Sequence, residues 1–329
     1  MRYKFFKRIS ISLLLVILLF SLLMIIPRSI GYLFPEKPPV GYYFESLNYL
    51  AIGVGLEKLA DLEPKIPETI EEIKNVEYKN VYGKSLQIDL YKPKNAGEPL
   101  PLLLFIHGGG WKSGKRSDYM VYLISFAEKG YMTGTVSYRL KRDSIYPASV
   151  EDVSDAVEWV FKNGENFGYD PHRVALIGGS AGAHLSMLAA YGWRDSRSQM
   201  DSIANNNQIK AVVDIYGPVD LTDDYAQTQP LVTGFMGHSY REKPELYKEA
   251  SPITYLSKSA PPTLILHGTS DKLVPIHQSD TLKSRLDELE VPCEYYKLPF
   301  WPHAMDIATR VNDFSQKKME EFFEKYLLR

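Results

Sequence analysis

One serine in this chain stands among residues without bulk, as a catalytic nucleophile requires. Ser180 lies at the centre of the sequence GGSAG at 178–182, between the apolar run 173–179 and an Ala- and Leu-rich stretch that is helical in pattern. This G-x-S-x-G pattern, with a strand before it and a helix after it, is typical of a serine held on a sharp, strained turn. The alternative is a glycine-rich turn with an incidental serine, and the flanking strand and helix argue against it. We therefore predict that Ser180 is the nucleophile of an acyl-transfer reaction.

Three consecutive glycines follow an earlier apolar run. The run 100–106 leads directly into HGGG at 107–110, although glycine costs backbone entropy in any regular element. An attacking serine needs N–H donors for the negatively charged tetrahedral oxygen, and losing one such donor costs about 3–4 kcal/mol. Bare backbone supplies such donors, so Gly109 and Gly110 are predicted to form the oxyanion hole with Ala181, whose N–H would begin a helix. A phosphate-binding loop is the alternative, but the Lys-Ser/Thr pair and the G-x-G-x-x-G spacing of such loops are both missing here.

A nucleophilic serine also needs a base, and the base needs a carboxylate that orients it. Asp271 comes just after the apolar run 261–268, and His303 comes just after the next run, 293–299. Residues that follow the carboxyl ends of parallel strands meet at one edge of the sheet. We therefore predict that Asp271 and His303 lie beside Ser180 and complete a Ser-His-Asp triad. The alternatives are a turn aspartate and a surface-loop histidine.

Other histidines and carboxylates fit a catalytic role less well. His107 is expected to brace the glycine loop through hydrogen bonds rather than to act as the base. His184 lies one turn into the helix after the serine, where its side chain is poorly placed to meet the hydroxyl. His267 ends a strand and is expected to be packed, and His277 begins a helix. Asp306 does not directly follow a predicted strand, so it could replace Asp271 in the triad only if the triad carboxylate did not have to follow a strand end.

Aromatic residues near these motifs are candidates for lining the alcohol or acyl pocket. They are Trp111, directly after the glycines, and Tyr225, Phe235 and Tyr240 of the long insertion 218–257. Long insertions in compact domains are often lids or binding loops. The alternative, which the sequence favours, is that these four side chains are ordinary core or surface aromatics.

The rest of the chain alternates apolar strands with amphipathic helices. Eight strands are expected, at 76–83, 84–93, 100–106, 131–138, 173–179, 209–217, 261–268 and 293–299, with helices at 150–164, 279–290 and 312–328. The polar stretch 192–208 is expected to be a loop. Because strands that alternate with helices form parallel sheets, we predict an α/β fold with a mostly parallel eight-stranded sheet and helices on both faces.

The N-terminal segment predicts an anchor in a membrane. Residues 9–26 carry no charge, and 18 residues of helix span about 27 Å, close to the thickness of a bilayer core. Four basic residues precede the apolar stretch (Arg2, Lys4, Lys7 and Arg8), which predicts the N-terminus inside and the bulk of the chain outside. No A-x-A-type cleavage site follows, so an uncleaved anchor is preferred, and secretion after signal cleavage is the alternative.

These features divide the chain into three segments. Residues 1–27 form the signal-anchor, residues 28–75 form a juxtamembrane connector that ends in the helix-like stretch 67–75, and residues 76–329 form the catalytic domain. The insertion 218–257 would be a lid of that domain.

Composition excludes several other classes of protein. The net charge is −2 and charged residues make up 24% of the chain, so no nucleic-acid partner is expected. The single cysteine, Cys293, excludes an internal disulfide and is expected to be a buried structural thiol. The spacing of cysteines and histidines is not that of a zinc site, and the chemistry proposed above needs no metal or cofactor. Nothing in the sequence indicates an oligomeric state.

Taken together, the motifs resemble those of the α/β-hydrolase superfamily. The closest resemblance is to carboxylesterases with an HGGGW oxyanion loop, a group that includes hormone-sensitive-lipase-like, BD-FAE (feruloyl or acetyl-xylan esterase-like) and kynurenine formamidase-like enzymes. It covers about residues 76–328 and depends on HGGGW (107–111), SYRL (137–140), GGSAGAH (178–184), DKLVP (271–275) and PH (302–303).

The resemblance also carries implications for individual residues. It implies the α/β-hydrolase fold, and structural rather than catalytic roles for Tyr138, Arg139 and Asp152. Hormone-sensitive-lipase-like enzymes usually read GDSAGG, whereas Gly179 and Ala183 stand here, which favours the other two groups. The N-terminal anchor is not part of the family pattern.

The expected function is therefore that of a serine carboxylesterase acting on a short-chain acyl ester. An amidase, arylformamidase or peptidase with the same triad is the alternative. A non-catalytic binding protein is disfavoured, because such proteins typically lose the serine or the histidine. The ester could belong to a glycan, a lipid or a small molecule, and the residues do not choose among these.

Overall fold

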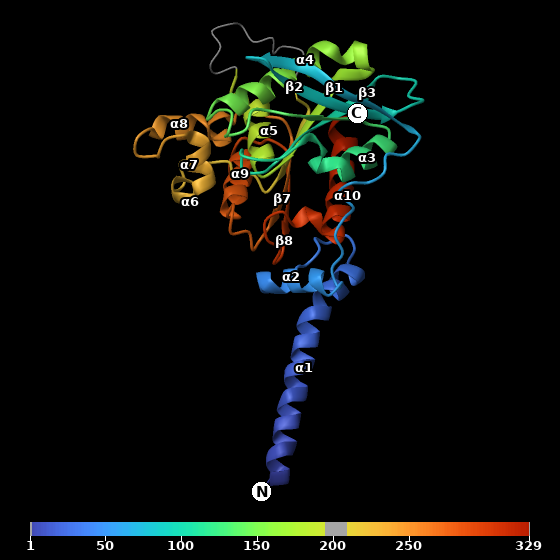
Figure 1. Ribbon diagram of the computed structural model, residues 1–329, viewed down its shortest axis with the longest axis vertical. Helices are drawn as coiled ribbons and strands as arrows, with labels where there is room; N and C mark the ends of the chain where they lie inside the picture. The colour runs from blue at the N-terminus through green and yellow to red at the C-terminus, as the bar shows by residue number, and fades with distance from the viewer. Residues whose placement is uncertain (1, 195–208, 329) are drawn as a thin grey trace.

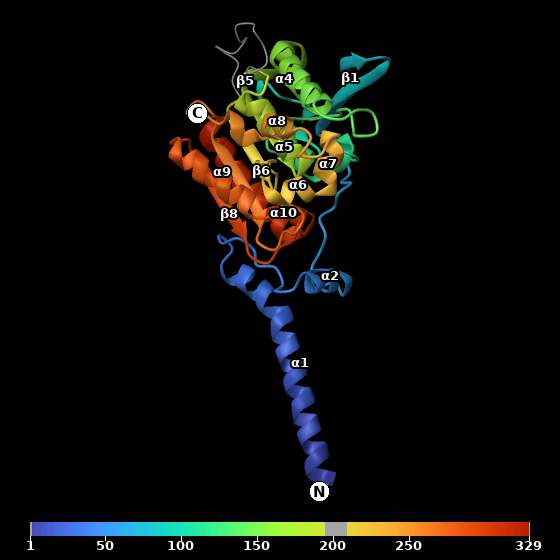
Figure 2. The ribbon, with the colours of Figure 1, turned by 90° about the vertical axis from the view of Figure 1, so that its left-hand side faces the viewer.

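The computed structural model describes residues 2–194 and 209–328, so most of the stretch 192–208 that was expected to be a loop lies outside the described residues. A rounded α/β body stands at the end of one long helix (Figures 1 and 2). Its strands are β1 Ile70–Val81, β2 Lys84–Pro93, β3 Leu100–Ile106, β4 Met132–Val136, β5 Tyr169–Gly179, β6 Ala211–Ile215, β7 Thr263–Gly268 and β8 Cys293–Leu298. Its α-helices are α1 Arg2–Leu33, α2 Glu45–Gly53, α3 Met120–Glu128, α4 Ala148–Phe167, α5 Ala181–Tyr191, α6 Asp224–Thr228, α7 Pro230–Met236, α8 Pro244–Glu249, α9 His277–Glu288 and α10 Thr309–Tyr326. Short 3₁₀ turns lie at Arg116–Tyr119, Pro252–Tyr255 and Met305–Ile307.

The strands form one sheet of eight in the order β1-β2-β4-β3-β5-β6-β7-β8. The pairs β1–β2 and β2–β4 are antiparallel, and every later pair is parallel. The prediction of a mostly parallel eight-stranded sheet is confirmed. Because β5, β7 and β8 run in the same direction, the residues that follow them lie at one edge of the sheet.

Helices cover both faces of this sheet, as expected. In β3, Leu102, Leu104 and Ile106 face α4, α5 and α9 in the larger core. The alternate residues Leu103 and Phe105 face α3 and α10 in the second core. All five side chains are fully buried, which explains why β3 appears in the sequence as an uninterrupted apolar run.

The prediction that the stretch 67–75 is helix-like is wrong. From Ile70 onward it is the first half of β1, which pairs with β2 from Ile70 opposite Pro93. A register shift between Ile73 and Val76 changes the phase of the strand, so the apolar residues do not alternate strictly. The strand therefore crosses the boundary predicted between the connector and the catalytic domain. Helices α2 and α3, and the short helices α6, α7 and α8 of the insertion, were not predicted from the sequence.

The insertion 218–257 is packed against the body. It contains α6, α7 and α8, and Val219, Leu221 and Val232 are buried in the larger core. Figure 2 shows the three helices over the same side of the sheet as α5 and α9.

Helix α1 projects away from the body for most of its length (Figures 1 and 2). Its segment Ser12–Leu33 has 22 residues, and it is long and apolar enough to cross a membrane. A signal sequence near an N-terminus has the same properties. At its C-terminal end α1 meets the body: Arg310 of α10 donates to the carbonyl oxygens of Pro27 and Val40 and pairs with Glu57.

Candidate active site

Ser180 lies on the turn between β5 and α5. Its backbone has φ 56° and ψ −123°, a strained conformation for a residue with a side chain. The turn is held by hydrogen bonds from Ser180 N–H to the carbonyl of Ile215 and from His184 N–H to the carbonyl of Ser180. A Cβ on Gly182 would lie 2.0 Å from the carbonyl oxygen of Ile106, so this position admits only glycine. The turn leaves the Ser180 side chain partly exposed.

The structure brings the three predicted triad residues together. His303 Nε2 lies 3.0 Å from Ser180 Oγ, and His303 Nδ1 lies 2.6 Å from Asp271 Oδ2. The carboxylate can only accept, so Nδ1 carries the proton and Nε2 is free to accept one from the serine. The three residues come from the ends of β5, β7 and β8, the edge that the sequence predicted.

The carboxylate of Asp271 is buried and fully engaged. Its Oδ1 accepts the N–H groups of Leu273 and Val274 at 2.8 and 2.9 Å, and its Oδ2 faces both His303 and His267. Burial raises the pKa of Asp271, but hydrogen bonds from the two imidazoles outweigh burial and hold the pKa at about 2. Asp271 is therefore a carboxylate at every physiological pH.

His267 is a partner of Asp271 that the sequence analysis took only for a packed residue. Its Nε2 lies 3.1 Å from Asp271 Oδ2 and 2.9 Å from the carbonyl oxygen of Val274, both of them acceptors, so Nε2 carries the proton. Its Nδ1 lies 2.7 Å from Ser279 Oγ. The prediction that His267 is packed is confirmed, since its side chain is fully buried.

The glycine loop approaches the serine from the end of β3. A Cβ on Gly108 would lie 2.7 Å from the carbonyl oxygen of Gly179, and Gly109 has φ +101° with the carbonyl oxygen of Ser113 2.4 Å from any Cβ. Gly110 has φ +60°, so close packing or a positive φ explains each of the three glycines. Within residues 2–194 and 209–328, the N–H groups of Gly109, Gly110 and Ala181 donate to no other protein group. These three N–H groups therefore have no acceptor among the described protein groups.

The residues around the loop hold it in place. His107 stacks on Tyr138 at 4.3 Å and donates from Nδ1 to the carbonyl of Gly108, while the Tyr138 hydroxyl donates to the carbonyl of His107. His184 accepts from Trp111 Nε1 and donates to the carbonyl of Ala250. Burial lowers the pKa of His184 to about 4, so it stays neutral. Neither histidine reaches the serine hydroxyl.

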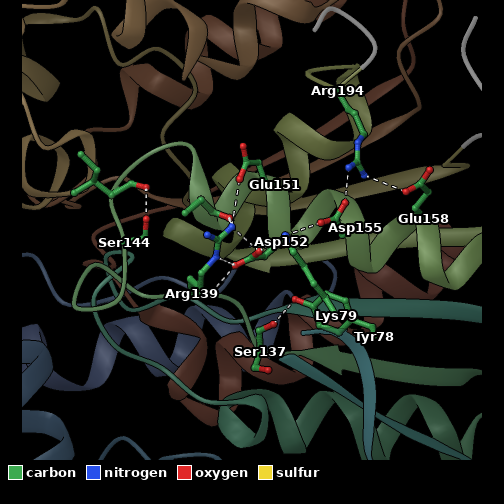
Figure 3. A network of polar contacts seen from close by, with 12 residues as sticks. Tyr78, Lys79, Ser137, Arg139, Ser144, Glu151, Asp152, Asp155, Glu158 and Arg194 are labelled. Atoms are coloured by element: carbon green, nitrogen blue, oxygen red, sulfur yellow. Dashed lines mark hydrogen bonds and ion pairs between the residues drawn. The ribbon is translucent and has the colours of Figure 1, made fainter. Parts of the chain in front are cut away.

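An ion-pair network holds the segment 138–141, whose residues contact the glycine loop (Figure 3). Arg139 donates from its backbone N–H and its guanidinium to Asp152 of α4, whose side chain is fully buried. Lys79 of β1 reaches the same carboxylate at 2.6 Å. Two residues beyond Arg139, the N–H of Lys141 donates to the carbonyl of Trp111. The network thus acts on the glycine loop through the backbone.

The four aromatic pocket candidates do not lie in one place. Trp111 and Phe235 stack on each other at 4.5 Å in the larger core, with 4% and 2% of their surface exposed. Tyr240 packs against Tyr247. Tyr225 differs from the others: its hydroxyl is buried and has no hydrogen-bond partner among the described residues, and its ring lies 6.0 Å from that of His277. The sequence also gave no sign of Leu231, whose side chain covers Gly110.

A buried polar cluster behind His303 was not predicted. The ring of Tyr216 lies 4.6 Å from the His303 ring, and its hydroxyl donates to Asp306, which is buried. Burial raises the pKa of Asp306. The Tyr119 hydroxyl lies against Gly179 in the same cluster, where a Cβ would come within 2.1 Å of it. No hydrogen bond joins Asp306 to the His303 ring nitrogens, whereas Asp271 Oδ2 lies 2.6 Å from His303 Nδ1.

Comparison with known proteins identifies a family whose model covers most of the residues described above. The family model BD-FAE matches residues 88–286, which include the glycine loop, Ser180 and Asp271. This chain belongs to the BD-FAE family. Its sheet, helices and strand-end site are those of an α/β-hydrolase, as the resemblance in sequence implied.

Curated relatives of this BD-FAE member carry esterase names. The probable carboxylic ester hydrolase LipM of Mycobacterium tuberculosis is 32% identical over 235 residues, which is 69% of this chain and 54% of that protein. Esterase LipQ of the same organism is 32% identical over 70% of this chain and 56% of its own length. The chain thus spans about half the length of these two relatives.

Solved structures share the fold. A carbohydrate esterase from gut microbiota, in truncated form, has a TM-score of 0.67 at 24% identity over 79% of this chain and 97% of its own. Esterase 2 of Thermogutta terrifontis has a TM-score of 0.66 at 22% identity over 80% of this chain and 94% of its own. Helix α1 and the connector that includes α2 lie outside residues 88–286, the part of the chain that the family model matches (Figure 1).

Proposed function

We propose that this BD-FAE member is a serine carboxylesterase that hydrolyses short-chain acyl esters through an acyl-enzyme. The observation that carries the proposal is the chain of contacts from Ser180 Oγ to His303 Nε2 at 3.0 Å and from His303 Nδ1 to Asp271 Oδ2 at 2.6 Å. The esterase names of the relatives favour an ester over an amide substrate.

In the proposed reaction, His303 Nε2 takes the proton of Ser180 Oγ as the oxygen attacks the ester carbonyl. Asp271 holds the imidazole through Nδ1–H and stabilises the cation that forms. The tetrahedral intermediate collapses when His303 returns the proton to the departing alcohol, which leaves an acyl group on Ser180. Water then attacks the acyl group with His303 as the base, and the carboxylic acid leaves.

The developing oxyanion is proposed to bind the free N–H groups of Gly109, Gly110 and Ala181. Support comes from their lack of protein acceptors and from the position of Ala181 at the first turn of α5, where the helix dipole favours negative charge. Preorganised donors of this kind need no rearrangement as the charge develops.

Two side chains are proposed to contact the substrate. Leu231 of α7 lies over Gly110, which limits the space beside the oxyanion loop and favours a short acyl group. The unpartnered Tyr225 hydroxyl is suited to donate to a polar atom of the ester or its alcohol. Trp111 and Phe235 are proposed to support the pocket from the core.

The domain organisation is also proposed. Residues 9–26 anchor the chain, the N-terminus is inside, and the catalytic domain lies outside the cytoplasm, beginning with β1 at Ile70. An uncleaved anchor is supported by Met24 of α1, which is buried against Tyr42 and Ala51 of the connector. Secretion after cleavage would remove this contact.

The test is hydrolysis of p-nitrophenyl acetate by the full chain in detergent micelles. Ser180→Ala is expected to lose the activity by about 10⁴-fold or more, and Ser259→Ala, an exposed serine, is the matched control. A fluorophosphonate probe should label the wild type and the control but not Ser180→Ala. Hydrolysis that persists in Ser180→Ala would overturn the proposal.

A further inference from the structure

The part of the connector around α2, residues 38–57, carries few charged side chains. Between residues 38 and 57 the only charged side chains are Glu45 and Glu57. Glu45 pairs with Lys272 at 2.8 Å, and Glu57 pairs with Arg310 at 2.6 Å. Both carboxylates are thus paired with basic residues of the catalytic domain.

The outer surface of this segment is apolar and aromatic instead. Around α2, the exposed fractions are 62% for Tyr43, 56% for Phe44, 59% for Tyr49, 40% for Leu50 and 60% for Val54. We call these five residues the α2 patch. The opposite side of α2 is buried through Asn48 and Ala51, so the helix has one inward and one outward face. A patch of this kind on a soluble domain marks a contact surface.

Helix α2, which bears the α2 patch, packs against the apolar part of α1. Met24, inside the candidate span Ser12–Leu33, packs against Tyr42 and Ala51 on the inner side of α2. Met24 stands nine residues before Leu33, which is about 13 Å along a helix. Figure 1 shows α2 lying across the body end of α1. The helix that bears the α2 patch is therefore in contact with the candidate membrane span, which brings the patch within reach of a bilayer crossed by α1.

The same segment packs against the loops that carry the acid and the base. Asn48 Nδ2 donates to the carbonyl of Phe300, three residues before His303, and the rings of Tyr43 and Phe300 lie 5.3 Å apart. The Glu45–Lys272 pair stands directly beside Asp271 in sequence. One rim of the active site is thus built from the segment that bears the α2 patch.

We propose that the α2 patch lies in the membrane–water interface and that the enzyme takes its ester from the bilayer. Tyr and Phe favour this interface, and a helix with one apolar face lies in its plane. The substrate class is then an amphiphilic ester with a short acyl group and a lipophilic alcohol. This inference rests on the proposed function, since it names the source of the substrate of the same site.

The position of the patch is tested without any assay of activity. The chain has one cysteine, Cys293, whose thiol is half-buried and has a pKa raised to about 12 by burial. In a Cys293→Ser background, a nitroxide is attached at Tyr49→Cys, and in a second protein at Tyr82→Cys. Tyr82 is fully exposed on the turn between β1 and β2, and Figure 1 shows these two strands in the part of the body away from α1.

Both full-length proteins are reconstituted in phosphatidylcholine vesicles. The nitroxide at 49 is expected to collide more with oxygen than with a water-soluble nickel chelate, and the nitroxide at 82 is expected to do the reverse. Equal exposure of both positions to the nickel chelate would overturn the placement of the patch.

The source of the substrate is tested with two esters that share the acetyl group. Hexadecyl acetate is dissolved in the vesicles, and p-nitrophenyl acetate is added in water. The double variant Tyr49→Ser, Leu50→Ser should lose about tenfold on hexadecyl acetate, equivalent to about 1.4 kcal/mol, and nothing on p-nitrophenyl acetate. Tyr82→Ser should change neither rate.

The outcomes separate this inference from the proposed function. An equal change of both rates in the double variant, or no change in either, would overturn delivery from the bilayer while leaving esterase activity intact. Two results together support both proposals. Ser180→Ala should lose hydrolysis of both esters, and the double variant should lose hydrolysis of hexadecyl acetate only. If Ser180→Ala hydrolyses both esters like the wild type, the proposed function fails, and the delivery proposal fails with it.

Discussion

His267 donates from Nε2 to Asp271 Oδ2 across 3.1 Å, so the carboxylate oxygen that faces His303 is shared by two imidazoles. This second donor helps to hold the pKa of Asp271 at about 2 against the effect of burial. His267 does not touch the serine, so we treat it as a positioning residue. Its proposed role is to fix the carboxylate that in turn orients His303.

Replacing His267 by Phe should therefore reduce turnover more than substrate binding. We expect kcat for p-nitrophenyl acetate to fall about tenfold with KM unchanged, because a misplaced carboxylate weakens the transition state only. The free energy of unfolding should fall by about 1–3 kcal/mol, the cost of a lost hydrogen bond to a buried charge. His277→Phe, at a partly exposed histidine paired with Asp223, is the control. A pure loss of stability with normal kcat would show that His267 only packs.

Gly109 should not tolerate a side chain. The φ of +101° and the carbonyl oxygen of Ser113, 2.4 Å from a Cβ, mean that Gly109→Ala must displace the loop. We expect a loss of about 100-fold or more in kcat/KM, since this loop carries the proposed oxyanion donors. Gly97→Ala is the matched control, because nothing lies within 4 Å of a Cβ there. Full activity of Gly109→Ala would exclude this glycine from the oxyanion hole.

Asp214 of β6 should make stability fall as pH rises. The residue is fully buried, its Oδ2 has no partner among the described residues, and burial raises the pKa to about 7. In the unfolded chain the pKa is about 4. Between pH 4 and pH 7 the folded state thus binds more protons than the unfolded state, and stability declines over that range.

Asp214→Asn should remove this dependence, because Asn keeps the acceptor for the Gly217 N–H and carries no charge. Urea unfolding at pH 5 and pH 8 measures the effect. The free energy of unfolding of the variant, relative to that of the wild type, is expected to increase by about 2.5 kcal/mol between pH 5 and pH 8. A difference between the two proteins that stays constant with pH would contradict a titration of Asp214 in this range.

The proposed uncleaved anchor predicts that the N-terminus stays on the mature protein. A tag fused before Met1 should stay on the mature protein in the membrane fraction, because α1 remains joined to the body at Met24 and Arg310. Protease added to intact cells stripped of any outer layer should degrade the catalytic domain and spare the tag. Recovery of a tag-free catalytic domain in the soluble fraction would favour the signal-peptide alternative.

Much of the site could be predicted because strand ends are visible in sequence. Ser180, Asp271 and His303 each follow an apolar run, and the structure places them in contact at one sheet edge. Tyr216 also follows a strand, β6, but a tyrosine at that point does not signal that its ring will pack on a histidine. Contacts of this kind depend on tertiary packing, which no local pattern reports.

The wrong prediction at 70–73 and the missed helix α2 also have their cause in contacts with distant parts of the chain. In IEEI at 70–73 the apolar residues stand three apart, which is typical of a helix, and only the register shift after Ile73 makes them compatible with β1. Helix α2 is short and mixed in composition. Its inner face is defined by Met24 and Phe300, which are distant in sequence, so the amphipathic pattern emerges only once those partners are in place.

The most direct test of the central claim is to identify the residue that is acylated during turnover. The full-length enzyme is mixed with p-nitrophenyl acetate, quenched in acid within the steady state, digested and mapped by mass spectrometry. The account predicts an acetyl group on Ser180 that disappears when the substrate is exhausted. Turnover with no acetyl group on Ser180, or with the acetyl group on another residue that persists in Ser180→Ala, would contradict it.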